Sequence, residues 1–465
     1  MYESQLRNLF SIRFKFWSKL QARIFARPSV QASPTKFPRV NAFRCTEAMP
    51  TLLSLPSEIL SLICNQVARL DIGYVDALYF NRAPASGDLA AVSRTCRLLH
   101  QVVEPMLYRC ITTHKKFFCL FRTLVTREDL TSHVKRAYMD GWNYQKTIEP
   151  LYEEREVVKQ LARQLSHDKD GNIRLLNSES VEWAMKDPFQ IVDLVDEYHN
   201  EDEVGKLFLA LTLLLLPRLE YLDLVLHYNL ETDLYAQNHF QFLTEIVFKH
   251  WDTKYGIDLS EINGLLAAAP NVRVLRGFMV ASVGDVVCHK SVRELYLVDS
   301  TIDADGLILI MNSFPFLEVF TYESGGTMVG DVEARPCDFT DALIQRNDTL
   351  RHVSIDLINS DECGDPSGAL QSLQSMQVLE TLQLDVPSIY TRNREEFTTD
   401  GNRIINLLPS SIKSLSLVHI DPRLRQDSLR LAQVAPKRFP HLKQVTFSKG
   451  DPALCEELNK AFLSE

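Results

Sequence analysis

The sequence predicts an α/β protein in which a short helical region precedes a solenoid of strand–helix units. Two patterns indicate this fold class: amphipathic helical spacing between residues 52 and 111, and a template, L-x-x-L-x-L, that recurs between residues 219 and 447. The chain of 465 residues is 45% hydrophobic and 24% charged, which is typical of folded proteins with a sizeable core.

The helical region begins at Leu55. Pro56 suits the first helical position, where its missing N–H costs nothing, and the helix dipole favours Glu58 in the first turn. A second helix is expected to stop at Pro105. The apolar stripes are Ile59, Ile63, Val67 and Leu70 in the first helix, and Leu89, Val92, Cys96, Leu99 and Val103 in the second. Two helices within about fifty residues are too few to bury both stripes without help.

The template recurs eight times, with its first positions separated by 53, 20, 25, 33, 29, 33 and 30 residues. Those first positions are Leu219, Val272, Val292, Leu317, Leu350, Leu379, Ile412 and Leu442. Prolines precede several of them, and apolar helix-like segments such as "EINGLLAAAP" and "GLILIMNSFP" come before the strands. Eight such matches favour a solenoid, in which each unit covers the apolar face of its neighbour. An ordinary α/β domain with amphipathic strands is the alternative.

Residues 1–48 carry nine Lys and Arg and two acidic residues, a net charge of +7, so the remainder carries −17 of the total of −10. This basic segment is expected to be a disordered tail, or to be absent if Met49 is the true start. Its amphipathic "NLFSIRFKFWSKLQARIF" also has the character of a mitochondrial presequence or a membrane-surface helix.

The acidic remainder of the chain argues against nucleic-acid binding, because phosphate backbones are repelled. The longest apolar run, 207–216, is closed by Pro217 and is shorter than the ~20 residues of a membrane span. Nine cysteines without a CxxC pair indicate reduced thiols, as in the cytoplasm or nucleus. We therefore expect that location, or mitochondria if the basic segment is a genuine presequence.

Two regions resemble known families. Residues 52–111 resemble an F-box of the fungal type, through Leu55-Pro56-x-Glu58-Ile59-Leu60, Leu89-x-x-Val92-Ser93-x-x-Cys96-Arg97, and the trailing Pro105-x-Leu107-Tyr108. The segment between Leu70 and Leu89 is longer than in the usual motif. Residues 219–447 resemble irregular leucine-rich repeats. They depart from that family because no Asn or Cys stands at the polar ladder position, so the repeat geometry is expected to be irregular.

These resemblances imply the substrate receptor of an SCF-type (Skp–cullin–F-box) E3 ubiquitin ligase, which itself performs no catalysis. The F-box would bind the Skp adaptor, and through it the cullin–RING ligase, while the repeats hold an unknown protein substrate. The implied adaptor contacts are Leu55, Pro56, Ile59, Leu60, Ile63, Val92, Cys96 and Leu99. Because neighbours along a strand point to opposite faces, the candidate substrate contacts are Asp223, Arg276, Tyr296, Thr321, Ser354, Gln383, Ser416 and Thr446. The rival hypothesis is a repeat scaffold that binds proteins without any ligase.

No catalytic residue, cofactor site or metal site is predicted. Residues 166–177, "SHDKDGNIRLLN", resemble an EF-hand loop only in part, since Ser166 and Asn177 replace the expected acidic ligands. Cys288-His289 lacks further ligands at metal spacing. The predicted organisation is a tail (1–48), the F-box (49–111), a helix-rich charged linker (112–205) and the solenoid (206–465).

Overall fold

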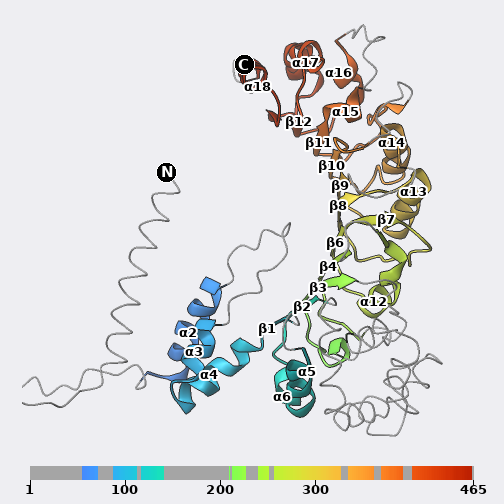
Figure 1. Ribbon diagram of the computed structural model, residues 1–465. Coiled ribbons are helices and arrows are strands. Elements are labelled where there is room, and N and C mark those ends of the chain that lie inside the picture. The colour runs from blue at the N-terminus through green and yellow to red at the C-terminus, as the bar shows by residue number, and fades with distance from the viewer. Residues whose placement is uncertain are drawn as a thin grey trace, which may run out of the picture. The chain divides into compact units, whose positions relative to one another are not determined.

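A computed structural model describes residues 55–71, 87–112, 117–140, 209, 212–226, 239–250, 256–325, 333–360, 368–390 and 401–462. The basic segment 1–48, the EF-hand-like loop 166–177 and most of the expected linker lie outside these residues. The described chain is α/β, as predicted, and its largest element is a parallel β-sheet of eleven strands (Figure 1).

The strands of this sheet follow one another in chain order, and every neighbouring pair is parallel. They are β1 (Cys110–Thr112), β2 (Arg136–Asp140), β3 (Tyr221–Leu226), β4 (Glu245–His250), β6 (Val274–Phe278), β8 (Glu294–Ser300), β9 (Val319–Ser324), β10 (His352–Asp356), β11 (Thr381–Asp385), β12 (Ser414–Val418) and β13 (Gln444–Ser448). A separate pair consists of β5 (Ile257–Asp258) and β7 (Val280–Ser282).

Most helices of the described segments are short, and α12, α13 and α14 lie on one face of the sheet (Figure 1). Before the sheet come α2 (Ser57–Asp71), α3 (Gly87–Ser93) and α4 (Arg97–Leu107), and within its first part α5 (Phe117–Thr126) and α6 (Glu128–Thr131). The later ones are the 3₁₀ helix η4 (Leu259–Ile262), α12 (Asn263–Ala268), α13 (Ala304–Ser313), α14 (Pro336–Ile344), α15 (Val386–Ile389), α16 (Arg403–Leu407), α17 (Leu424–Arg438) and α18 (Pro452–Ala461). The helix-like segments "EINGLLAAAP" and "GLILIMNSFP" indeed contain α12 and α13.

A tight turn precedes most strands and explains the prolines of the repeat. The N–H of Leu317 donates to the carbonyl of Phe314 at 3.2 Å, which places Pro315 in the second position of the turn. The same bond recurs before β3, β6 and β13, with Pro217, Pro270 and Pro440 in that position. The fixed φ of proline suits the second residue of a β-turn, so each proline sets the direction in which its strand begins.

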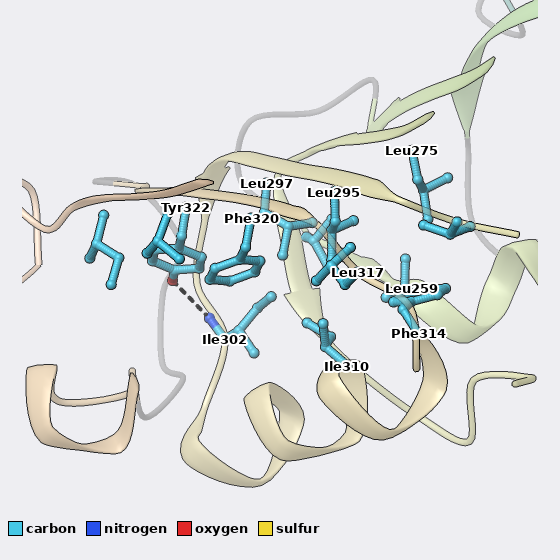
Figure 2. Close-up of a cluster of buried hydrophobic side chains, with 14 of the residues drawn as sticks. Leu259, Leu275, Leu295, Leu297, Ile302, Ile310, Phe314, Leu317, Phe320 and Tyr322 are labelled. Carbon is cyan, nitrogen blue, oxygen red and sulfur yellow. Dashed lines mark hydrogen bonds between the residues drawn. The ribbon is translucent and has the colours of Figure 1, made fainter. Parts of the chain in front are cut away.

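The template positions form the core of the sheet. From Leu219 to Leu417 their apolar side chains are buried, whereas Leu442 and Val445 at the last strand are only half-buried. In Figure 2, Leu295 of β8 and Phe320 of β9 face Ile310 of α13. Each strand–helix unit therefore covers its neighbour, and the last strand has a neighbour on one side only.

The unequal spacing of the template has a structural cause. β4 lies between Leu219 and Val272 and carries the same pattern at Leu243, Ile246 and Phe248, all buried, so the gap of 53 residues contains an additional unit. β2 lies earlier still, within the segment that was expected to be a helical linker, with buried Val134, Ala137 and Met139 at the template positions.

Different polar side chains join successive turns where a repeat ladder would use Asn or Cys. The Tyr322 hydroxyl donates to the carbonyl of Ser300 at 2.8 Å. It also accepts from the N–H of Ile302 at 3.2 Å (Figure 2). Two units later, the carboxylate of Asp385 accepts from the N–H groups of Leu357 at 3.0 Å and Ser388 at 3.2 Å. Individual side-chain hydrogen bonds thus join these neighbouring connections.

The backbones of successive turns also lie very close to one another. Gly325 follows β9, and a Cβ there would lie 2.5 Å from the carbonyl oxygen of Asp299, closer than any real side chain allows. Asp299 itself has a φ of 49°, where β8 departs from regular pairing. A glycine is required at this position because the neighbouring turn leaves no room for a side chain.

Asp385 gives a pH-dependent prediction. Burial, followed by the charge of Asp356, raises the pKa of this carboxyl from 3.8 to about 6, although the Ser388 hydroxyl bond opposes the shift. Because the pKa of Asp385 is higher in the folded protein than in the unfolded chain, its protonated form stabilises the fold. This contribution is complete below pH 3.8, the pKa in the unfolded chain, and is lost as the pH rises through about 6. Asp385→Asn removes that dependence. Measured between pH 4 and 7, the free energy of unfolding of the variant should gain up to about 3 kcal/mol relative to the parent protein. A difference that does not change with pH would contradict this role of Asp385.

Candidate protein-interaction surfaces

The first candidate surface lies on helices α2, α3 and α4. The carbonyl of Pro56 accepts from the N–H groups of Ile59 at 3.0 Å and Leu60 at 3.1 Å, so the first helix begins at Ser57, one residue later than predicted. The second helix is broken in two, because Cys96 has an extended backbone (φ −161°) and its Sγ accepts from the N–H of Leu99 at 3.5 Å. Cys96 is therefore the N-cap of a separate helix, α4.

Contrary to the prediction, Pro105 does not stop the second helix. It lies within α4. The helix continues to Leu107, and the N–H of Tyr108 still donates to the carbonyl of Glu104 at 3.2 Å. Proline gives up only its own hydrogen bond in this last turn, and the helix ends two residues later.

These helices have a small core of their own. Cys64, Leu89 and Val103 form a buried cluster that is separate from the cluster beneath the sheet. Four partly buried side chains pack against it: Val92, Val102, Met106 and Leu107. With Leu60 and Leu99, five apolar side chains of these helices are buried, which is few for three helices.

The predicted adaptor contacts divide into two groups. Leu60 and Leu99 are buried within the chain, so their side chains serve the protein's own packing. Leu55, Val92 and Cys96 are half-buried, and Pro56, Ile59 and Ile63 are exposed. Only the exposed and half-buried members are available to a partner in this structure.

Two further side chains belong to the exposed apolar surface, and they are not among the predicted adaptor contacts. Leu62 is 60% exposed beside Ile59 (41%) and Ile63 (40%) on α2, and Leu98 on α4 is 39% exposed. Positions i, i+3 and i+4 lie on one side of a helix, so the three α2 residues form one apolar face. The i+3 relation between Ile59 and Leu62 was the signal available in the sequence.

The second candidate surface crosses the sheet. The eight predicted substrate contacts are all half-buried, and the strand register brings them into one row. In order the row is Asp223, Val247, Arg276, Tyr296, Thr321, Ser354, Gln383, Ser416 and Thr446. Tyr138 precedes Asp223 in it. Tyr138 and the buried Val247 were not predicted, because the template was not recognised in β2 and β4.

Aromatic and charged side chains are concentrated in the first half of this row and beside it. The Arg276 guanidinium lies 4.0 Å from the ring centre of Tyr296, and its Nε donates to Glu245 at 2.9 Å. The rings of Tyr138 and Tyr221 are 5.4 Å apart. Burial, then a hydrogen bond from its hydroxyl to Glu294, raises the pKa of Tyr296. The row continues through uncharged Thr, Ser and Gln from β9 onward.

Tyr and Arg are the residues that most often dominate protein interfaces, whereas Ser and Thr rarely do. The half of the row on β2 to β8 is therefore the better candidate for strong contacts. Its side chains already pair with one another, so they would lose little freedom on binding.

Metal chemistry finds no support among the described residues. Cys288 is exposed, but His289 is buried and its Nε2 donates to the carbonyl of Ala269 at 3.1 Å. Burial lowers the pKa of His289. No group of three His, Cys, Asp or Glu side chains in the described segments could hold a metal ion. None of the helices described there has the length and apolar character to cross a membrane.

Comparison with known proteins adds no relative: no protein-family model matches the chain, and no curated protein matches it.

The separate core of the helices can be tested with Val103→Ala. Removing two buried methyl groups should cost about 2 kcal/mol, which raises amide hydrogen exchange in α2, α3 and α4 roughly 30-fold. Exchange in the sheet should not change, because Val103 belongs to the other cluster. Val102→Ala, at a partly buried neighbour, is the control with the smaller expected effect. Equal acceleration in the sheet would show that the two clusters unfold as one.

Proposed function

We propose that the chain is the substrate-recognition subunit of an SCF-type E3 ubiquitin ligase. In this proposal α2, α3 and α4 are an F-box that binds the Skp adaptor, and the strand–helix units form an irregular leucine-rich-repeat solenoid that binds the substrate. The observation that carries it is the apolar face of α2, formed by Ile59, Leu62 and Ile63, which is exposed in the described part of the chain.

The apolar face suits a partner with a hydrophobic groove. An amphipathic helix binds such a groove through anchors at i, i+3 and i+4, which is the spacing of these three residues. Each side chain that becomes fully buried contributes roughly 1.5–3 kcal/mol, and the half-exposed ones contribute less because part of their area is already covered. The three α2 anchors, with Leu98, can thus support a stable complex.

In this role the chain itself catalyses no reaction. The receptor holds the substrate at a fixed place relative to the adaptor, and the ubiquitin transfer occurs on other subunits. The row from Tyr138 to Thr446 supplies the substrate-binding surface, with its aromatic and arginine residues on β2 to β8 as the main contacts. Its substrate is a protein of unknown identity, and the complex would act in the cytoplasm, the nucleus or both.

The alternative, a repeat scaffold without a ligase, shares the sheet but assigns no partner to α2. It would leave an exposed apolar face on α2 unexplained, and large exposed hydrophobic side chains usually mark a binding surface when they are contiguous. That face is the reason to prefer the ligase receptor.

Co-expression with the Skp adaptor tests the proposal. The double variant Ile59→Asp/Ile63→Asp places charges on the apolar face without touching the buried Leu60 and Cys64, so the fold should persist and adaptor co-purification should be lost. Leu55→Ala/Pro56→Ala should weaken it too.

The matched control is Ser61→Asp, which adds a charge at a position that is neither three nor four residues from Ile59, Leu62 or Ile63 and should retain the adaptor. Far-ultraviolet circular dichroism verifies that each variant is folded. Adaptor binding by the folded Ile59→Asp/Ile63→Asp protein would refute the contact face, and no adaptor binding by the parent chain would favour the scaffold.

A further inference from the structure

Two other large hydrophobic side chains are exposed in the described residues, and they occupy equivalent places. Phe242 is 51% exposed and Phe316 is 46% exposed. Each lies in the third position of the turn before its strand, three residues before Glu245 of β4 and Val319 of β9. Glu245 and Val319 belong to one register row through β6 and β8. Both rings therefore lie at the edge of the sheet where the strands begin.

Cations hold both rings in place. The Arg293 guanidinium lies 5.1 Å from the ring centre of Phe316, and its Nη1 donates to the carbonyl of Lys290 at 2.7 Å. The Lys135 ammonium lies 5.7 Å from the ring centre of Phe242. Glu318 and Glu220 pair with these two cations at 3.5 and 2.7 Å. The two rings thus have an ordered setting before any partner binds.

Unpaired positive charge surrounds the rings. Arg218, Arg273 and Lys290 are exposed at the same edge, and none of them has an acidic partner within the described part of the chain. Arg218 lies in the turn before β3, next to the turn of Phe242, while Arg273 and Lys290 come just before β6 and β8, between the two rings. The residues outside the basic tail carry a net charge of −17, so this edge differs in sign from the rest of the chain.

The spacing limits what can bind across both rings. Three strand intervals separate β4 from β9, which at about 4.8 Å each places the two turns about 14 Å apart. An extended peptide rises about 3.4 Å per residue, so residues i and i+4 span that distance and point to the same side. In an α-helix the same distance corresponds to about nine residues, which lie on opposite faces.

We propose that this edge, formed by Arg218, Phe242, Arg273, Lys290, Arg293 and Phe316, binds an extended acidic segment of a partner protein. Apolar or aromatic side chains at positions i and i+4 of that segment pack on Phe242 and Phe316, and an acidic side chain at i+2 pairs with Arg273 or Lys290. This surface is distinct from the apolar face of α2 and from the row across the sheet, and it does not depend on the ligase role.

The binding is tested by fluorescence anisotropy with the full chain and a labelled peptide Gly-Phe-Ser-Asp-Ser-Phe-Gly. Two comparison peptides carry Lys in place of Asp, or have the two Phe three residues apart. We expect the first peptide to bind about tenfold more tightly than either comparison peptide, and its affinity to fall as the salt concentration rises.

Variants of the chain give the second set of measurements. Phe242→Ser, Phe316→Ser and Arg273→Glu should each weaken binding of the first peptide about tenfold, and their exposed positions leave folding intact. Val378→Ser is the matched control, because Val378 occupies the same turn position before β11, away from both rings. It should bind the peptide like the parent protein.

Three outcomes would overturn the proposal. The first is equal affinity for the Asp and Lys peptides, and the second is equal weakening by Val378→Ser. The third concerns a lipid surface, which could also attract exposed Phe and basic residues. If the chain bound vesicles of phosphatidylcholine and phosphatidylserine through Phe242 and Phe316 and did not bind the peptide, the edge would be a membrane contact.

Discussion

The rest of the structure depends on one continuous backbone ladder, in which every strand of the large sheet pairs in parallel with the preceding strand of that sheet. Parallel pairing in chain order fixes the register of each new strand against the last, and so it brings equivalent positions of each unit into rows. The inward rows are leucine-rich and form the core, while the outward row contains Arg276 and Tyr296. The turns that begin the strands are aligned in the same way, so features far apart in the sequence, such as Phe242 and Phe316, belong to one edge.

Periodicity predicted the inward rows well, because burying a leucine layer imposes a strict pattern on the sequence. The outward row followed from the alternation of a strand, and the register brought all eight predicted positions together. The template was not recognised in β2 and β4. β2 uses Val134, Ala137 and Met139, and Ala137 does not read as a core position without its neighbours.

On α2 the sequence could not separate the inward face from the outward one. Leu60 and Cys64 are buried, whereas Ile59 and Ile63, one position earlier, are exposed. Both pairs are apolar at i and i+4, so the helical pattern alone does not tell which pair faces the chain's own core. Packing against α3 and α4 decides it, because Cys64 lies in one buried cluster with Leu89 and Val103. The proposed adaptor face is therefore shifted toward Leu62 relative to the sequence prediction.

The most direct test of the ligase-receptor proposal is hydrogen–deuterium exchange of the full chain with and without the Skp adaptor. The account predicts slower exchange in α2 and at the start of α4, where Ile59, Leu62, Ile63 and Leu98 would become buried, with little change in β3 to β13. Unchanged exchange in α2 at saturating adaptor, or protection confined to the sheet, would contradict it.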